Sequence, residues 1–310
     1  GAGGADAAIG LPAGDVIDAT VAHYRQSFDA RNGGLSRAPK FPSHVPVRLL
    51  LRYHQRTGDA DALRMATLTL EKMAAGGLYD QLGGGFHRYS TDVRWLVPHF
   101  EKMLYDNALL VVAYAEAFQI TGRADFARVA RETCDYILRE MTDAGGGFYS
   151  ATDADSEGEE GRFFVWREDE IRRELDALGD GDTTERFLAH YDVHPGGNWE
   201  GHTILNVPHP DEGAWEELAA ARARLYAVRL RRTPPLRDEK ILAAWNGLMI
   251  SALAVAGRIL DAPHYVAAAV RAADFVLTRL RGADGGLRRS FKDGQAKQAA
   301  FLDDHAFLAA

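Results

Sequence analysis

An apolar stripe recurs along this chain at the spacing of an amphipathic α-helix. The copies begin at Thr57, Thr121 and Leu260. In the second copy, apolar or small residues occupy positions i, i+3, i+4, i+7, i+11 and i+12, counted from Phe126. Glycines follow each copy, at 76–77, 145–147 and 285–286, and glycine is a common helix stop. The pattern predicts helices that each cover a core with one face.

A second kind of helix precedes two of these copies. The segments are EKMLYDNALLVVAYAEAFQITG from Glu101 and EKILAAWNGLMISALAVAGRIL from Glu239. Both are apolar on nearly every face, which is typical of a helix buried all round. LDDHAFLAA, from Leu302, begins like a further one. Alternation of buried and one-sided helices predicts an all-α fold, an α/α toroid whose inner helices form a wall that the outer helices cover. An irregular helical bundle is the alternative.

The chain has 310 residues, enough for one large domain. We expect a flexible N-terminal segment at 1–14 and a single toroid domain over 15–310, with a β-decorated insertion at about 145–210. The chain begins without Met and ends inside a helical pattern, FLDDHAFLAA. These ends predict a piece of a longer protein, with a six-hairpin barrel left incomplete at its C-terminus.

Composition argues against several classes of function. A net charge of −8 opposes nucleic-acid binding, which usually needs a basic face. The single cysteine, Cys134, rules out an intrachain disulfide framework and a multi-cysteine metal site. There is no uninterrupted run of about 18 apolar residues, no signal peptide and no nucleotide-binding glycine loop or serine-hydrolase motif. The sequence therefore predicts a cytoplasmic protein without metal, cofactor, membrane or nucleic-acid partner.

The segment 77–100 is too long for a simple connector between helices. It carries His87, Arg88, Tyr89, Trp95 and His99, a mixture of rings and charges that suits a sugar-like ligand. Histidine titrates near neutral pH, so we predict that His87 and His99 are a proton-transfer pair at the mouth of the ring. Arg88 would steady a developing oxyanion, with Tyr89 and Trp95 binding the ligand. The alternative is a loop whose rings plug the barrel rim.

Polar residues also recur where the inner helices start. Asp106, Asp238 and Asp304 are the candidate catalytic carboxylates there. Trp245 and Asn246 stand out on a helix that otherwise favours small apolar residues, so we expect them to face the lumen and bind the ligand. Helix capping and the helix dipole are the alternative explanation for the acids.

Further candidate ligand-binding residues flank these positions. Asp153 and Asp155 lie in DADSEGEEG, which begins like a calcium loop but has Phe164 where the bidentate Glu should be. We therefore expect either a solvated hairpin tip or carboxylates that reach over the mouth. Glu101 and Arg237, at the starts of the two inner-helix motifs, complete the set.

Four longer motifs carry a family resemblance. They are APKFP (38–42), YDQLGGGFHRYSTDVRWLVPHFEKMLYDNALL (79–110), FYSATDADSEGEEGRFFVW (148–166) and RDEKILAAWNGLMISALA (237–254). With them the chain resembles the spermatogenesis-associated thioredoxin-domain protein family, whose bacterial members are uncharacterised. The resemblance implies a toroid similar to N-acylglucosamine 2-epimerases and six-hairpin glycosidases. It also implies an N-terminal thioredoxin-like domain as a partner, which this chain lacks.

Three functions stay open at this point. The first is a sugar-processing enzyme of the epimerase or isomerase type, using His87 and His99. The second is an inverting glycoside hydrolase, which would need two carboxylates, from Asp106, Asp238 and Asp304, on opposite sides of the cavity. The third is a ligand- or protein-binding module without catalysis that serves the thioredoxin-like domain.

Overall fold

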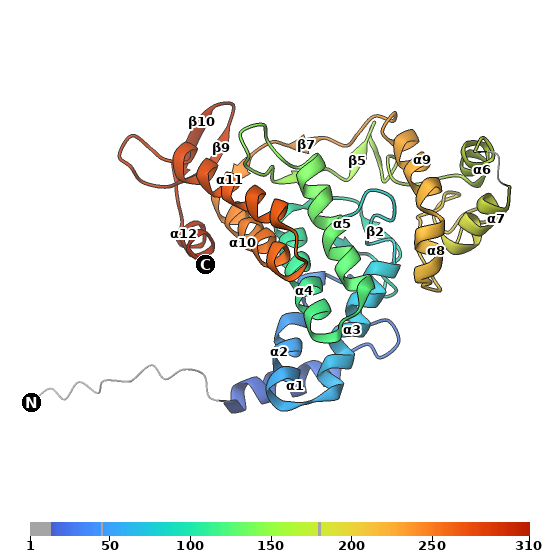
Figure 1. The fold of residues 1–310 in the computed structure, drawn as a ribbon, viewed down its shortest axis with the longest axis horizontal. Helices are drawn as coiled ribbons and strands as arrows, with labels where there is room; N and C mark the ends of the chain where they lie inside the picture. The colour runs from blue at the N-terminus through green and yellow to red at the C-terminus, as the bar shows by residue number, and fades with distance from the viewer. Residues whose placement is uncertain (1–13, 45, 179–180) are drawn as a thin grey trace, which may run out of the picture.

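The structure, a computed structural model, describes residues 14–44, 46–178 and 181–310, so most of the segment expected at 1–14 lies outside the described residues. The first described helix is α1 (Gly14–Ser27), and the helices that follow it, apart from those of an insertion between α5 and α10, alternate between two layers (Figure 1). The inner layer holds α2 (Val47–Thr57), α4 (Leu104–Thr121), α10 (Ala243–Ile259) and α12 (Leu302–Ala309). The outer layer holds α3 (Ala60–Ala75), α5 (Ala124–Glu140) and α11 (Pro263–Arg279).

The packing follows the alternation that the sequence predicts. Each inner helix contacts the next, in the order α2, α4, α10, α12, and α2, α4 and α10 each pack on the outer helix that follows them. Helix α4 is buried on most of its surface, whereas α5 buries one stripe that runs from Phe126 to Ile137. This arrangement is that of an α/α toroid, and the described helices form part of its ring.

The inner helices leave one narrow stripe uncovered. On α4, Tyr105, Leu109 and Glu116 are only partly buried or exposed, and they follow one another at helical spacing. Glu116 accepts hydrogen bonds from Arg48 and Arg52 of α2, at 2.8 and 3.2 Å. Because these ion pairs join two neighbouring inner helices, the stripe faces the concave side of the wall.

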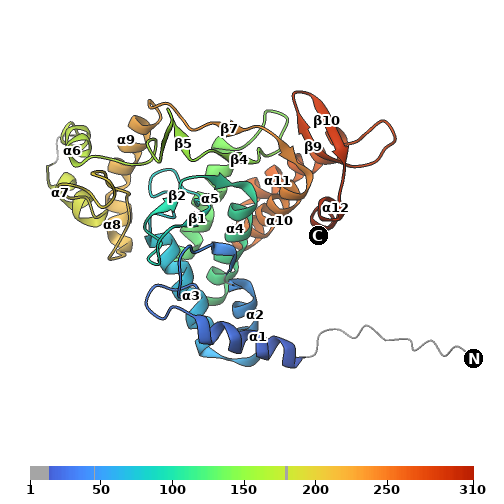
Figure 2. The same ribbon diagram turned by 180° about the vertical axis from the view of Figure 1, so that it is seen from behind.

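The predicted insertion has its own small core. Its helices are α6 (Glu168–Asp176), α7 (Gly181–His190), α8 (Glu212–Glu217) and α9 (Ala219–Arg229). Trp166, Leu175, Phe187 and Leu225 are buried among them. The insertion lies beside α5 and away from α12 (Figures 1 and 2), and its helical part extends beyond 210, to Arg229.

Short strands join the loops at one end of the helices. A three-stranded sheet of order β3-β4-β7 pairs β3 (Lys102–Met103), β4 (Ala151–Thr152) and β7 (Arg237–Asp238). This sheet ties together the loops that enter α4 and α10. The other strands are β1 (Tyr89–Ser90) with β2 (Pro98–His99), β5 (Asp155–Ser156) with β6 (Glu159–Glu160), and β8 (Ile241–Leu242) with β9 (Arg288–Lys292) and β10 (Gln295–Ala299).

The glycine-rich loops are held by an asparagine that repeats with them. The Asn107 side chain accepts a hydrogen bond from the Phe86 N–H (2.7 Å) and donates to the Phe86 carbonyl (3.1 Å). Asn246 makes the same pair of bonds to Phe148, at 2.8 and 3.0 Å. Both phenylalanines end a Gly-Gly-Gly-Phe sequence. The repeated asparagine therefore fastens each loop to an inner helix, Phe86 to α4 and Phe148 to α10.

The glycines allow these loops to lie directly on the outer helix. Gly85 has φ +78°, and a Cβ there would stand 2.5 Å from the Tyr136 ring of α5. Gly84 has φ +74°, and its Cβ would stand 2.6 Å from the Glu132 carbonyl oxygen. Only glycine takes this backbone conformation freely and leaves the space that the contact requires.

Candidate functional site

The candidate site is the mouth of the toroid, which we define as Arg88, Tyr89, His99, Glu101, Tyr105, Asp106 and Trp245. These residues come from the loop 77–103 and from the first turns of α4 and α10. The backbone holds the loop in place, since the Arg88 N–H donates to the Glu101 carbonyl (2.8 Å) and Tyr89 pairs with His99 across β1 and β2. Loop and helix starts therefore present their side chains on one surface.

Asp106 has the most perturbed carboxyl group of the mouth. Its side chain is 4% exposed, and its Oδ2 has no hydrogen-bond partner in the part of the chain that the structure describes. Burial raises the pKa of Asp106 to about 7, although Arg88 and Tyr105 lie close enough to oppose this rise. A carboxyl group that titrates near neutral pH can both donate and accept a proton, which a general acid–base group must do.

Arg88 and Glu101 act on this carboxyl group through their charges, and His99 and Glu160 are linked to them by further polar contacts. Arg88 Nη1 donates to Glu101 Oε2 at 2.9 Å, and Arg88 Nε is buried without a partner among the described residues. His99 Nδ1 lies 2.7 Å from Glu160 Oε1, and its Nε2 lies 3.7 Å from Glu101 Oε2. The β5–β6 hairpin thus reaches the mouth through Glu160. The Arg88 guanidinium is therefore fixed beside Asp106 with one N–H left unused.

Aromatic rings flank the charged groups on two sides. Tyr89 stacks on His99 with ring centroids 5.0 Å apart, and Phe41 stacks on the other side of Tyr89 at 4.6 Å. Tyr105 and Trp245, on the neighbouring inner helices, meet edge to face at 4.8 Å. Trp245 is only partly buried, so part of its ring surface stays accessible, and its role in ligand binding remains a prediction.

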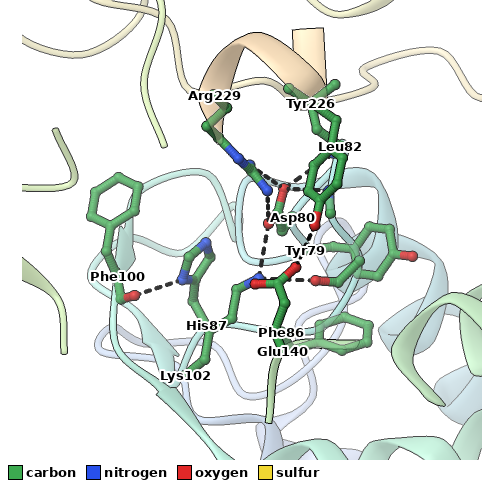
Figure 3. Close-up of polar contacts among 12 residues, drawn as sticks. Tyr79, Asp80, Leu82, Phe86, His87, Phe100, Lys102, Glu140, Tyr226 and Arg229 are labelled. Carbon is green, nitrogen blue, oxygen red and sulfur yellow. Dashed lines mark hydrogen bonds and ion pairs between the residues drawn. The ribbon is translucent and has the colours of Figure 1, made fainter. Parts of the chain in front are cut away.

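His87 lies inside the loop, away from the open mouth. Its side chain is 2% exposed, and Nδ1 lies 2.9 Å from the Phe100 carbonyl oxygen (Figure 3). Burial, together with the nearby charge of Lys102, lowers the pKa of His87 to about 3. The imidazole is therefore neutral at physiological pH and contacts the packed loop. Of the predicted histidine pair, only His99 lies at the surface of the mouth.

Beneath the loop, Asp80 bridges two buried cations. It accepts two hydrogen bonds from Arg229 of α9, at 2.7 and 2.8 Å, and one from Lys102, at 2.8 Å (Figure 3). All three side chains are at most 3% exposed. Although burial alone would raise the pKa of Asp80, the charges of Arg229 and Lys102 hold it well below its usual value. This triad fastens the insertion to the loop that carries the mouth.

Trp95 and Asn246, which we predicted to bind the ligand, are buried and make hydrogen bonds to the backbone of packed loops. Trp95 is fully buried, and its indole N–H donates to the Asn32 carbonyl at 2.9 Å, so no ring face is left for a ligand. Asn246 is also fully buried, because its amide holds Phe148. Both placements follow from the hydrogen bonds that these side chains make to backbone. Burial of Trp95 is what the alternative of a loop whose rings plug the barrel rim predicts.

Two of the candidate carboxylates, Asp304 and Asp238, already have hydrogen-bond or ion-pair partners. Asp304 is 1% exposed and accepts hydrogen bonds from the N–H groups of Ala244 (3.0 Å) and Phe301 (2.8 Å). Although partial burial opposes the shift, hydrogen bonds from Lys240 lower the pKa of Asp238, and the Lys240 ammonium lies 3.0 Å away. Of the three predicted carboxylates, Asp106 alone combines burial with an unpartnered oxygen.

The remaining candidates are Arg237, Asp153 and Asp155. Arg237 donates to the Glu140 carbonyl (2.9 Å) and to Glu239 (2.7 Å). Asp153, just before the β5–β6 hairpin, and Asp155, in that hairpin, are exposed. Their neighbour Glu160 is the residue of this hairpin that reaches the mouth, and no pattern in the sequence distinguishes it from the adjacent acids.

Within the described ranges, no group of three or more His, Cys, Asp or Glu side chains has the geometry to hold a metal ion. None of the helices described is both long enough and apolar enough to span a bilayer. The side chains of the mouth are acid–base groups, one guanidinium group and aromatic rings.

Curated proteins similar to this chain are longer than it. The chain is homologous to human spermatogenesis-associated protein 20, with 36% identity over 91% of the chain and 42% of the human protein. The mouse protein of the same name is 37% identical over the same shares. An uncharacterised protein of Caenorhabditis elegans is 31% identical over 95% of the chain and 46% of its own length. The chain thus spans less than half of these relatives, and no family model matches it.

Solved structures with a similar fold have low sequence identity to this chain. An unsaturated glucuronyl hydrolase from a Bacillus species gives a TM-score of 0.49 at 12% identity, over 86% of this chain and 52% of that one. An α-1,6-mannanase from a Salegentibacter species gives 0.47 at 14%, over 88% and 62%. A cellobiose 2-epimerase from Spirochaeta thermophila gives 0.40 at 15%, over 95% and 94%.

Proposed function

We propose that this homologue of spermatogenesis-associated protein 20 binds a sugar-like ligand at the mouth of its toroid and that Asp106 transfers a proton to or from it. The observation that carries the proposal is the Asp106 carboxyl group, buried at the start of an inner helix with a free oxygen and a pKa of about 7. Strongly perturbed carboxyl groups are typical of acid–base sites.

The neighbours of Asp106 support proton transfer at a carbon next to a carbonyl group, as in epimerisation. Removal of such a proton places negative charge on the carbonyl oxygen, and a fixed cation stabilises that charge. Arg88 suits this role, because its pairing with Glu101 fixes its direction while Nε keeps a free N–H. His99, bonded to Glu160, would be the second titratable group.

Ring surface at the mouth supports a ligand with apolar faces and polar edges. The partly buried Trp245 and Tyr105 line one side, and the stacked Tyr89 and His99 line another. Sugars offer such faces to aromatic rings, while their hydroxyl groups bind charged and polar side chains.

Inverting hydrolysis is the second candidate and is less well supported. That reaction needs one carboxylic acid and one carboxylate free to activate water. Besides Asp106, the mouth holds Glu101, but Glu101 already accepts a hydrogen bond from Arg88. Asp238 and Asp304 are paired or capping. A thioredoxin-like domain, and any use the longer protein makes of the mouth, stay predictions from the family resemblance.

A ligand screen of the chain against mono- and disaccharides by thermal shift tests the proposal. A ligand that binds only the folded state raises the apparent stability, and saturation at about 100 times Kd adds about 2.7 kcal/mol. We expect a shift with a reducing sugar and its loss in Arg88→Ala. Arg173→Ala, which removes an exposed arginine of α6, is the matched control. An unchanged shift in Arg88→Ala would place the ligand elsewhere.

A further inference from the structure

A second hollow lies on the outer side of the toroid wall. It has a volume of about 710 Å³ and lies where the end of α3 and the start of α5 meet the insertion. Its wall includes Lys72 of α3, Asp125 of α5 and Trp215 of α8. None of the mouth residues lines it. The volume falls in the range of small-molecule pockets, roughly 300–1,000 Å³.

One edge of this outer pocket is cationic. Arg31, Lys72 and Arg94 line it, and within the described ranges none of the three has a carboxylate partner. Arg123, by contrast, is paired with both Glu71 and Asp125. The loops that carry Arg31 and Arg94 are joined, because the Trp95 indole donates to the Asn32 carbonyl. Three cations without carboxylate partners at one pocket edge would attract an anionic group.

The floor of the pocket is built from two buried amides. Gln81 is 4% exposed, and its Nε2 donates to the carbonyl oxygens of Ala74 (2.8 Å) and Gly76 (3.0 Å). Asn206 is 8% exposed, and its Nδ2 donates to Asp192 and to the Ile204 carbonyl, both at 3.2 Å. In the described chain neither amide oxygen accepts a hydrogen bond. Both nitrogens are committed, so the oxygens are fixed acceptors for hydroxyl groups.

The acidic residues at the opposite edge of the outer pocket would determine the orientation of an anionic ligand. Asp192 and Asp211 line the pocket on the insertion side. Asp192 is bonded to Asn206, and Asp211 caps α8. An anionic group would be repelled there, so it belongs at the edge formed by Arg31, Lys72 and Arg94. The hydroxyl groups of the ligand would face the two amides of the floor and the two acids. All four of these side chains have oxygens that accept hydrogen bonds.

We propose that this outer pocket is a second ligand site, for an anionic polyhydroxy molecule such as a sugar phosphate or a sugar acid. Arg31, Lys72 and Arg94 bind the phosphate or carboxylate, and Gln81 and Asn206 accept from the hydroxyl groups. The site is independent of the proposed proton transfer at Asp106, since the two share no residue.

Calorimetric titration tests this proposal with glucose 6-phosphate and gluconate as probes, and with glucose and inorganic phosphate as their separate parts. Wild type should bind at least one of the two anionic sugars more tightly than either part. The double change Arg31→Ala/Arg94→Ala should weaken that binding by about tenfold or more, because it removes two of the three cations that would bind the anionic group. Both arginines are exposed, so folding should not suffer.

A control variant separates this site from nonspecific effects of charge removal. Arg173→Ala, which removes an exposed arginine of α6, should leave the titration unchanged. The proposal is overturned if neither anionic sugar binds wild type, or if both bind the double variant as tightly. Equal binding by inorganic phosphate alone would also overturn it, since the amide floor would then contribute nothing.

Discussion

Asp106→Asn is expected to lower turnover by a factor of about 10² to 10⁴ while leaving ligand binding within a few-fold of wild type. The amide has nearly the shape of the carboxyl group but cannot exchange a proton. Glu101 is the other acid whose charge acts on Asp106, but it accepts a hydrogen bond from Arg88 and is not free to replace it. The measurement is incorporation of solvent deuterium into a sugar found by the ligand screen, followed by NMR.

The matched control for this change is Asp303→Asn, which neutralises a more exposed acid at the start of α12. It should exchange deuterium at the wild-type rate. Equal exchange rates in Asp106→Asn and wild type would remove Asp106 from the chemistry. Hydrolysis of a disaccharide without deuterium incorporation at carbon would favour the glycosidase alternative.

Asp80→Ala should be among the most destabilising single changes in this chain. It leaves Lys102 and Arg229 buried side by side without their counter-ion, and loss of one partner of a buried ion pair costs about 3–5 kcal/mol. Because the pKa of Asp80 is lowered in the folded state, its contribution to stability is present above the normal aspartate pKa and is lost as the pH falls. Urea denaturation at neutral and acidic pH measures both effects.

Asp61→Ala is the control for Asp80, since it breaks ion pairs with Arg64 and Arg25 in which all the side chains are well exposed. Exposed pairs contribute about 1 kcal/mol or less, so Asp61→Ala should cost far less than Asp80→Ala. Similar losses in the two variants would contradict the account of the buried triad.

The layers of the fold were predictable because they depend on local periodicity. The stripe through Phe126 and Ile137 on α5, and the buried surface of α4, are properties of sequence spacing alone. The repeated Asn107 and Asn246 were visible in the sequence as well. Their role as loop clamps was not, because it depends on hydrogen bonds to Phe86 and Phe148, which lie far from them along the chain.

The sequence predicted a region for the candidate site, which stays a prediction, but it could not place the individual side chains. Sequence gives the type of a side chain but not the direction in which it points. His87 and His99 therefore looked equivalent, although one is packed inside the loop and the other lies at the mouth. Glu160 could not be singled out among neighbouring acids, because only the folded hairpin brings it to His99.

The buried triad was also beyond sequence reasoning. Asp80 and Arg229 are 149 residues apart, and nothing in the local sequence of either indicates a partner. Asp80 sits in a loop, and Arg229 is the last residue of α9. Only the packing of the insertion on the glycine-rich loop brings the two charges together.

The pKa of the Asp106 carboxyl group is the most direct test of the proposed site. NMR titration of aspartate labelled with ¹³C at the carboxyl carbon, with Asp106→Asn to assign the signal, measures it without any substrate. The account predicts a midpoint near pH 7, because burial raises the pKa of this group to about 7. A midpoint near 4, the usual value for aspartate, would mean that the carboxyl group is solvated and would contradict the proposed acid–base role.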